Sequence, residues 1–102
     1  MLSVLGHIVW VGDQSSIFMD GAKVAIKKYA IRGHDALDGA IAFAVIGAEK
    51  IKEFDIKRGD IVTVTLCFDI RDWNGVMVNE VRCVAVSHLL DIAGKRENDI
   101  KS

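Results

Sequence analysis

Residues 60–71 alternate strictly between apolar and polar side chains, and this alternation restricts the fold more than any other feature of the sequence. One face carries Val62, Val64, Leu66, Phe68 and Ile70. A period of two residues is that of a β-strand with one buried face. Asn74-Gly75, which follows, is the residue pair most typical of a two-residue hairpin turn. The sequence therefore predicts a strand from Asp60 to Arg71, a tight turn, and a returning strand from Val76 to Leu89.

Three further strands and one helix are predicted before this hairpin. The strands are Leu2 to Val11, Lys23 to Arg32 and Ala40 to Ile46, and the helix is Ala48 to Phe54. Gly6 lies inside the first strand, where a glycine indicates a bulge or a bend at a barrel corner. The segment from Gly12 to Asp20 is polar and is predicted to form a turn region that ends in Asp20-Gly21.

Five strands with a short helix between the third and the fourth follow the order of an OB fold, a five-stranded Greek-key barrel. We therefore predict an all-β protein of this class, and an all-β roll of another kind is the competing architecture. The 102 residues suffice for one domain with its own core. Residues 1–90 are expected to form the OB-fold domain, and residues 91–102 a polar, flexible C-terminal tail.

The net charge of −1 excludes indiscriminate attraction to polyanions, so any nucleic-acid role must depend on local charge. Residues 21–34 provide such a segment, because they contain four basic residues and no acidic one. No apolar run is long enough to span a membrane. Two cysteines and the lack of a signal peptide favour a reducing cytoplasm, in a bacterial cell or a phage-infected host.

Catalytic patterns are not evident in the sequence. His7, His34 and His88 are isolated and lack the spacing of zinc ligands. Cys67 and Cys83 fall on the two predicted hairpin strands and are interpreted as small core residues. We expect no enzyme activity, no cofactor and no metal.

From Ile41 to Leu89 the sequence resembles the C-terminal half of bacterial and phage single-stranded DNA-binding proteins. The resemblance lies in the apolar strand, the helix, the turn Lys57-Arg58-Gly59-Asp60, the hairpin Trp73-Asn74-Gly75 and a last strand with Glu80-Val81. Small OB proteins of bacteria and their phages are more similar still. The N-terminal half matches more weakly, at residues 6–9 and 21–25.

Two segments depart from that family. The loop from Gly33 to Gly39, which contains Asp35 and Asp38, is short where many members have a long hairpin that wraps DNA. The tail lacks the acidic tip with a terminal phenylalanine through which bacterial members recruit replication and repair proteins.

The resemblance implies sequence-tolerant binding of single-stranded DNA during replication, recombination or repair. Such binding combines basic side chains for the phosphates with aromatic rings on which bases stack. The predicted nucleic-acid-binding residues are Lys23, Lys27, Lys28, Tyr29, Arg32, Phe43, Arg71, Trp73 and Arg82.

Each aromatic candidate has a structural alternative. Tyr29 is expected to stack a base beside the lysines, and the alternative is a half-buried strand tyrosine. Trp73, at the hairpin, either contacts a partner or folds back over the barrel end. Phe43 faces either the ligand or the core. Trp10 shares a predicted face with Val4 and Ile8, which favours the core or a subunit interface.

Phe54 and Phe68 lie on periodic apolar faces and are predicted to be core residues. Arg71 pairs with a phosphate or with a nearby aspartate, and Arg82 either lines the groove or is a solvated strand residue. Because one barrel with few aromatics offers limited stacking, a homodimer or homotetramer is expected. Two alternatives stay open: single-stranded RNA as ligand, and a protein-interaction barrel without nucleic-acid affinity.

Overall fold

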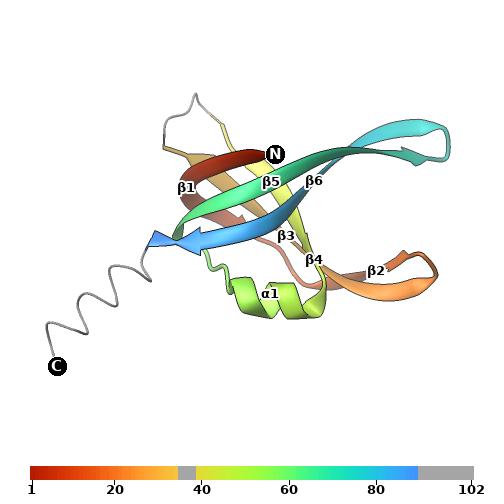
Figure 1. The fold of residues 1–102 in the computed structure, drawn as a ribbon, viewed down its shortest axis with the longest axis horizontal. Helices are drawn as coiled ribbons and strands as arrows, with labels where there is room; N and C mark the ends of the chain where they lie inside the picture. Colours follow the sequence, from red (N-terminus) through yellow and green to blue (C-terminus); the bar gives the residue numbers. More distant parts are fainter. Residues whose placement is uncertain (35–38, 90–102) are drawn as a thin grey trace, which may run out of the picture.

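The computed structural model describes residues 1–34 and 39–89, apart from the side chain of Trp73. Within these residues the chain forms six strands and one helix (Figure 1). They are β1 (Leu2–Val11), β2 (Ser15–Met19), β3 (Ala22–Gly33), β4 (Ile41–Ile46), α1 (Ala48–Phe54), β5 (Ile61–Trp73) and β6 (Val76–His88). The predicted helix has the observed bounds, and the five predicted strands differ from them by at most two residues. The predicted tail and most of the predicted loop from Gly33 to Gly39 lie outside the described residues.

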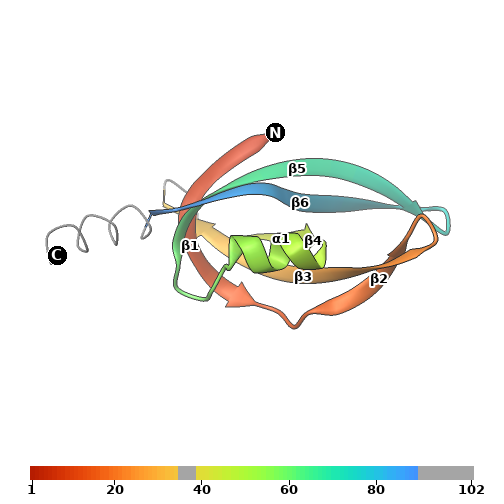
Figure 2. The ribbon, with the colours of Figure 1, turned by 60° about the horizontal axis from the view of Figure 1, so that its bottom comes forward.

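Five of these strands close into a barrel (Figure 2). Closure depends on β1, which pairs antiparallel with β3 along one edge and with β5 along the other. Gly6 lies where both pairings meet, opposite Gly33 of β3 and Val62 of β5. A Cβ atom at Gly6 would collide with the carbonyl oxygen of Arg32. The glycine is therefore required by the close approach of two backbones at the corner of the barrel.

The strand order around the barrel is β1, β3, β4, β6, β5. In the chain, α1 lies between β4 and β5, which are the third and fourth strands of the barrel in sequence order. This is the Greek-key arrangement of an OB fold, so the predicted fold class is confirmed. The contact between β4 and β6 is the weakest part of the ring, because Ala44 and Arg82 form its only parallel pair among the described residues. The barrel is thus partly open along this line.

The core fills the barrel and is closed at one end by α1 (Figure 2). Val62, Val64 and Leu66 of β5 are fully buried, as their alternation predicted. Ile51 of the helix and Ile56, just beyond it, complete the core at that end. Because α1 has only seven residues and no side-chain N-cap, its stability depends on this packing.

The segment predicted as a polar turn region, Gly12 to Asp20, contains the additional strand β2. Ser15 lies opposite Ile26 and Met19 opposite Ala22, so β2 and the start of β3 form a hairpin around Asp20-Gly21. The turn itself is confirmed, since both residues have positive φ angles, 52° and 78°. The strand was missed because Ile17, Phe18 and Met19 are consecutive apolar residues without alternation.

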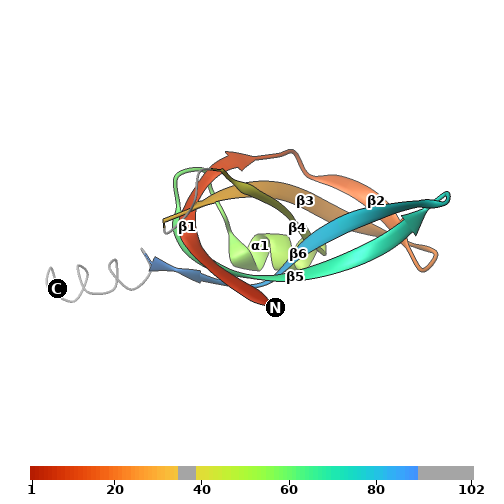
Figure 3. The ribbon, with the colours of Figure 1, turned by 90° about the horizontal axis from the view of Figure 1, so that it is seen from above.

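Two hairpins extend beyond the barrel, and both point away from the same end of it (Figures 1 and 3). We call residues 15–26 the β2–β3 arm and residues 68–81 the β5–β6 arm. The β5–β6 arm turns at Asn74-Gly75, where both φ angles are positive as the sequence predicted. The outer side of the barrel wall between the two arms is the region on which OB folds hold oligonucleotides.

Candidate nucleic-acid interface

A β-bulge in β1 decides which aromatic side chain is exposed on this side of the barrel. Ile8 lies opposite Ile31 of β3 and Trp10 opposite Ala30, so Val9 is an extra residue in the pairing. The extra residue reverses the alternation, and Trp10 faces solvent while Ile8 faces the core. Trp10 is accordingly 50% exposed and Ile8 only 1%. The prediction that Trp10 shares a face with Val4 and Ile8 is wrong, because the bulge lies at Val9 and not at Gly6, where the sequence indicated one. A subunit interface at Trp10 stays a prediction.

The indole of Trp10 lies over Gly12 and close to the backbone of β3. A Cβ atom at Gly12 would be 2.6 Å from Cη2 of Trp10 and 3.2 Å from the carbonyl oxygen of Lys28. The Gly12 N–H group donates a hydrogen bond of 2.8 Å to that same oxygen. The missing side chain at Gly12 thus provides space that the Trp10 ring occupies.

The solvent-facing side of β3, β4 and β6 next to Trp10 forms one continuous surface, which we call the outer face. Directly opposite residues of neighbouring strands point to the same side of a sheet. The opposed pairs are Lys28 with Ala44, Ala30 with Ala42, Arg32 with His7, and Ala44 with Arg82. Three of the predicted cations, Lys28, Arg32 and Arg82, therefore share the outer face with Trp10.

A groove of about 350 Å³ crosses the outer face between the two arms. Lys28, Ala42 and Ala44 contribute to its floor, and Ile17 of the β2–β3 arm lines it from one direction. The β5–β6 arm lines it from the other direction with Arg71, Val78, Asn79, Glu80 and Val81. The two small alanine side chains let a ligand approach the sheet closely.

The basic side chains in and beside the groove differ in whether they already form ion pairs; Lys28 and Arg71 line it, and Arg82 lies next to Ala44 of its floor. Nη2 of Arg71 lies 3.2 Å from Oε2 of Glu80, and Nη2 of Arg82 lies 3.4 Å from Oδ2 of Asp69. The partner of Arg71 is thus a glutamate of β6 and not the nearby aspartate that was its predicted alternative. No ion pair joins Lys28 to a described residue, and the side chain of Lys28 is exposed. Lys28 is therefore available to a phosphate directly, whereas both arginines must exchange a carboxylate for it.

Tyr29 belongs to the core, so its predicted role as an open stacking surface is wrong. The side chain is 1% exposed, and its ring stacks on that of Phe43 at a centroid distance of 5.5 Å. Burial, with smaller contributions from Cys83 and Asp55, raises the pKa of the Tyr29 phenol. Phe43 is 3% exposed, which confirms the core alternative for it. Phe43 contributes to the lining of the groove, but its ring and that of Tyr29 are almost entirely covered by neighbouring atoms.

The basic cluster of β3 is divided between the two sides of the strand. Lys23 and Lys27 alternate with Lys28 and point to the opposite side. Nζ of Lys27 lies 5.9 Å from the centroid of the Tyr29 ring, and Lys23 lies opposite Phe18 on the β2–β3 arm. The structure thus gathers Lys28, Arg32, Arg71 and Arg82 with Trp10 and separates Lys23 and Lys27 from them. The side chain of Trp73 lies outside the described part, and nucleic-acid contact by any of these residues stays a prediction.

The two cysteines lie on neighbouring strands but on opposite sides of the sheet. Cys83 lies opposite Leu66 in the core, and Cys67 lies opposite Arg82 on the outer face. Burial raises the pKa of the Cys83 thiol to about 11, and its Sγ–H group donates to the carbonyl oxygen of Ala85 at 3.3 Å. Cys83 is thus a core residue, as interpreted from the sequence, whereas the same interpretation of Cys67 is wrong because its side chain lies half-buried on the outer face.

Residues 1–34 and 39–89 contain no group of three or more histidine, cysteine, aspartate or glutamate side chains placed to hold a metal ion. In the same ranges, no helix combines the length and apolar character needed to cross a membrane.

No protein-family model and no curated protein sequence matches the chain. Among solved structures, the chain is similar to a small single-stranded DNA-binding protein from Streptomyces coelicolor. The two share 16% sequence identity with a TM-score of 0.46, over 88% of this chain and 94% of that one. The strand order, the register and the position of α1 identify the OB fold independently of this likeness.

Proposed function

We propose that the protein binds single-stranded DNA along the outer face, with little preference for sequence. Trp10 stacks a base, and Lys28 and Arg32 contact the adjacent phosphates. The observation that carries this proposal is the half-exposed indole, which the bulge at Val9 brings to the same side of the barrel as both cations. Aromatic rings beside basic side chains are what single-strand binding requires, and stacking tolerates any base.

The groove between the arms supplies the rest of the path. A single strand of DNA that passes from Trp10 over Lys28 crosses Ala42 and Ala44 of β4 and then reaches Arg71 and Arg82. There the phosphates displace Glu80 and Asp69 from the two arginines. This exchange lowers the gain from those contacts, so we expect Trp10, Lys28 and Arg32 to supply most of the affinity.

In the cell, the protein would cover exposed single strands during replication, recombination or repair. With one exposed indole on the described part of the outer face, a single barrel binds weakly. We therefore propose that it acts as a homodimer or homotetramer, whose linked sites raise the apparent affinity.

The proposal is tested by fluorescence anisotropy of a labelled oligo-dT with the Trp10→Ala variant. A stacked base contributes about 1–3 kcal/mol, so affinity is expected to fall by about 5-fold to 150-fold. Trp10→Phe should retain most of the affinity. The matched control is Phe18→Ala, which removes an aromatic ring that is 77% exposed but lies on the other side of the β2–β3 arm. Thermal unfolding should be nearly the same for all variants.

The salt dependence of the affinity distinguishes binding through phosphate contacts from non-specific apolar adsorption. For single strands, log affinity falls with log salt by about 0.7 for each phosphate contacted. Lys28→Glu should weaken binding and flatten this slope. A wild-type protein that does not bind oligo-dT at low salt would contradict the proposal and leave the protein-interaction alternative. Preferential competition by oligo-rU would instead identify RNA as the ligand.

A further inference from the structure

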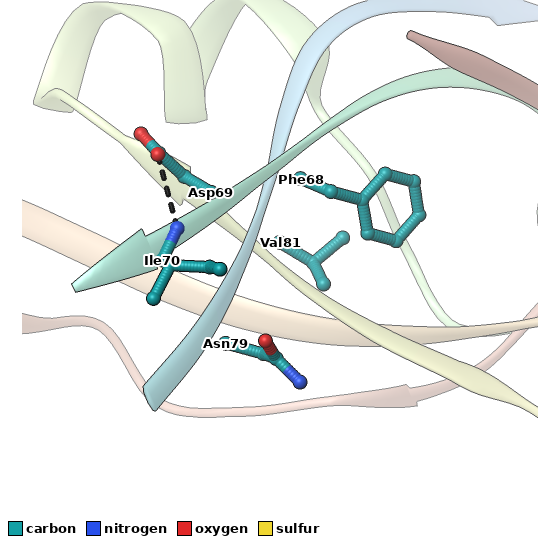
Figure 4. Close-up of a pocket in the computed structure, with 5 residues that line it drawn as sticks. All are labelled: Phe68, Asp69, Ile70, Asn79 and Val81. Carbon is teal, nitrogen blue, oxygen red and sulfur yellow. Dashed lines mark hydrogen bonds between the residues drawn. The ribbon is translucent and has the colours of Figure 1, made fainter. Parts of the chain in front are cut away.

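A second concavity lies on the opposite side of the β5–β6 arm from the outer face. It has a volume of about 620 Å³ and is lined by Phe68, Asp69, Ile70, Asn79 and Val81 (Figure 4). No specific DNA contact was assigned above to any of these residues, although Asn79 and Val81 also line the groove. We call this concavity the arm pocket.

The register of the arm explains why the arm pocket is largely apolar. Phe68 lies opposite Val81 and Ile70 opposite Asn79, so these four side chains share one side of the hairpin. It is the side that carries Leu66 and Cys83 within the barrel, continued past the point where the core ends. Phe68 and Ile70 are consequently 58% and 61% exposed, so the prediction that Phe68 is a core residue is wrong.

The one charged lining residue is directed away from this side. Asp69 alternates with Phe68, and its Oδ1 accepts a hydrogen bond of 3.0 Å from the N–H group of Ile70 (Figure 4). Its Oδ2 pairs with Arg82 of the outer face. The arm pocket therefore presents an aromatic ring, two aliphatic side chains and one neutral amide.

We infer that the arm pocket binds a nucleobase of the same DNA strand that occupies the groove. A flat, uncharged heteroaromatic ring matches this chemistry, because it stacks on the face of Phe68 and packs against Val81. The Asn79 amide offers both a donor and an acceptor, the pair needed to bind the edge of a base. Among the residues that the structure describes, no cation lines the arm pocket, so none of them would bind a phosphate there.

Two features connect the arm pocket to the groove. Asn79 and Val81 line both of them, so the two concavities meet across β6. The described part of β4 pairs with β6 only at Arg82, which leaves residues 76–81 without a strand neighbour on that edge. A DNA strand that leaves the groove can pass over this open edge of β6 and turn its next base toward Phe68. The inference rests on the proposed binding to the outer face and lengthens its path.

The test compares oligonucleotides of two lengths, because only the longer one reaches the arm pocket. OB folds cover about 4–16 nucleotides, so we choose oligo-dT of about 4 and about 12 residues. Phe68→Ala should weaken binding of the longer oligonucleotide by about 5-fold to 150-fold and leave the shorter one unchanged. Asn79→Leu, which removes the amide but keeps the volume, should weaken the longer one by a smaller factor. Phe18→Ala is again the matched control and should affect neither length.

Photocrosslinking gives a second readout that does not depend on affinity. An oligonucleotide carrying 5-iodouracil at successive positions is irradiated on the wild-type protein, and the adduct is located by mass spectrometry. A crosslink at Phe68 from one end of the longer oligonucleotide is expected.

The outcomes separate the inference from the proposal on which it rests. If Trp10→Ala weakens both lengths while Phe68→Ala weakens neither and no adduct forms at Phe68, the arm pocket does not bind a base and the outer face does. If the wild type binds neither length at low salt, both are wrong.

Discussion

The same strand face of β5 is buried inside the barrel and exposed beyond it. Val62, Val64 and Leu66 are fully buried, whereas Phe68 and Ile70, next in the same alternation, are 58% and 61% exposed. The difference lies in the neighbours. Residues 61–66 pair with β1 and β6 around the core, but from residue 67 onward the described structure gives β5 only β6 as a partner. Alternation thus specifies which side chains share a face, and the rest of the fold decides whether that face is covered.

The largest effect expected from this comparison is on folding stability. Leu66→Ala removes a side chain from the packed core and should lower the free energy of unfolding by about 2–5 kcal/mol. Ile70→Ala, four residues further on the same face, should change it by about 0.5 kcal/mol or less. Urea unfolding of both variants measures the two values. Equal losses of unfolding free energy in the two variants would mean that the β5–β6 arm is covered in solution, for example by a second copy of the chain.

A smaller effect on the free energy of unfolding is expected at alkaline pH from the thiol of Cys83, which lies in the barrel core and not on either arm. Its pKa is raised from 9.0 to about 11 in the folded protein. Between these values the unfolded chain has released a proton that the folded chain retains. The unfolded state binds fewer protons, so the free energy of unfolding falls as pH rises through this interval, by about 1.4 kcal/mol per pH unit at most.

Urea unfolding at pH 8, 9 and 10.5 tests this dependence, with Cys83→Ala as the control. The variant should lose most of the alkaline decline and keep the part due to Tyr29, whose pKa is raised in the same direction. An equally steep decline in the variant would assign the effect to groups outside the barrel core.

The smallest effect concerns the β5–β6 arm and should appear in the affinity for DNA rather than in the free energy of unfolding. Glu80→Gln frees Arg71 from its ion pair and removes a negative charge from the groove. The pair is only partly buried, with 40% of the Arg71 and 20% of the Glu80 side chain exposed, and glutamine keeps an acceptor oxygen for Arg71, so stability should change by about 1 kcal/mol or less. Affinity for oligo-dT should rise by up to about tenfold, with a steeper salt dependence. Weaker binding in this variant would show that the Glu80 carboxylate positions Arg71 for its contact.

Local signals were sufficient to predict the barrel from the sequence. The signals for the alternation of β5, for the turns at Asp20-Gly21 and Asn74-Gly75 and for the short helix α1 each lie within a few adjacent residues. Their order then leaves few topologies for an all-β chain. Gly6 was interpreted as a corner, and the structure shows the close backbone approach that requires it.

The site was harder to predict, because it depends on contacts between distant segments. Tyr29 follows two lysines and looks exposed, yet its partner in the core is Phe43, which β4 brings opposite it. Trp10 looks buried, yet the register between β1 and β3 turns it outward. The adjacent Gly12 was the one available signal, since a glycine near a large ring permits that ring to lie against the backbone.

The bulge at Val9 also bears on how related sequences should be compared with this one. A one-residue insertion shifts the phase of every side chain that follows it in the strand. A homologue without the bulge that has an aromatic residue two positions after its equivalent of Ile8 would carry that ring inside the barrel. Alignments that close the gap at this point would equate a solvent-facing indole with a core residue, and the length of the first strand is a better guide than the identity of its aromatic residue.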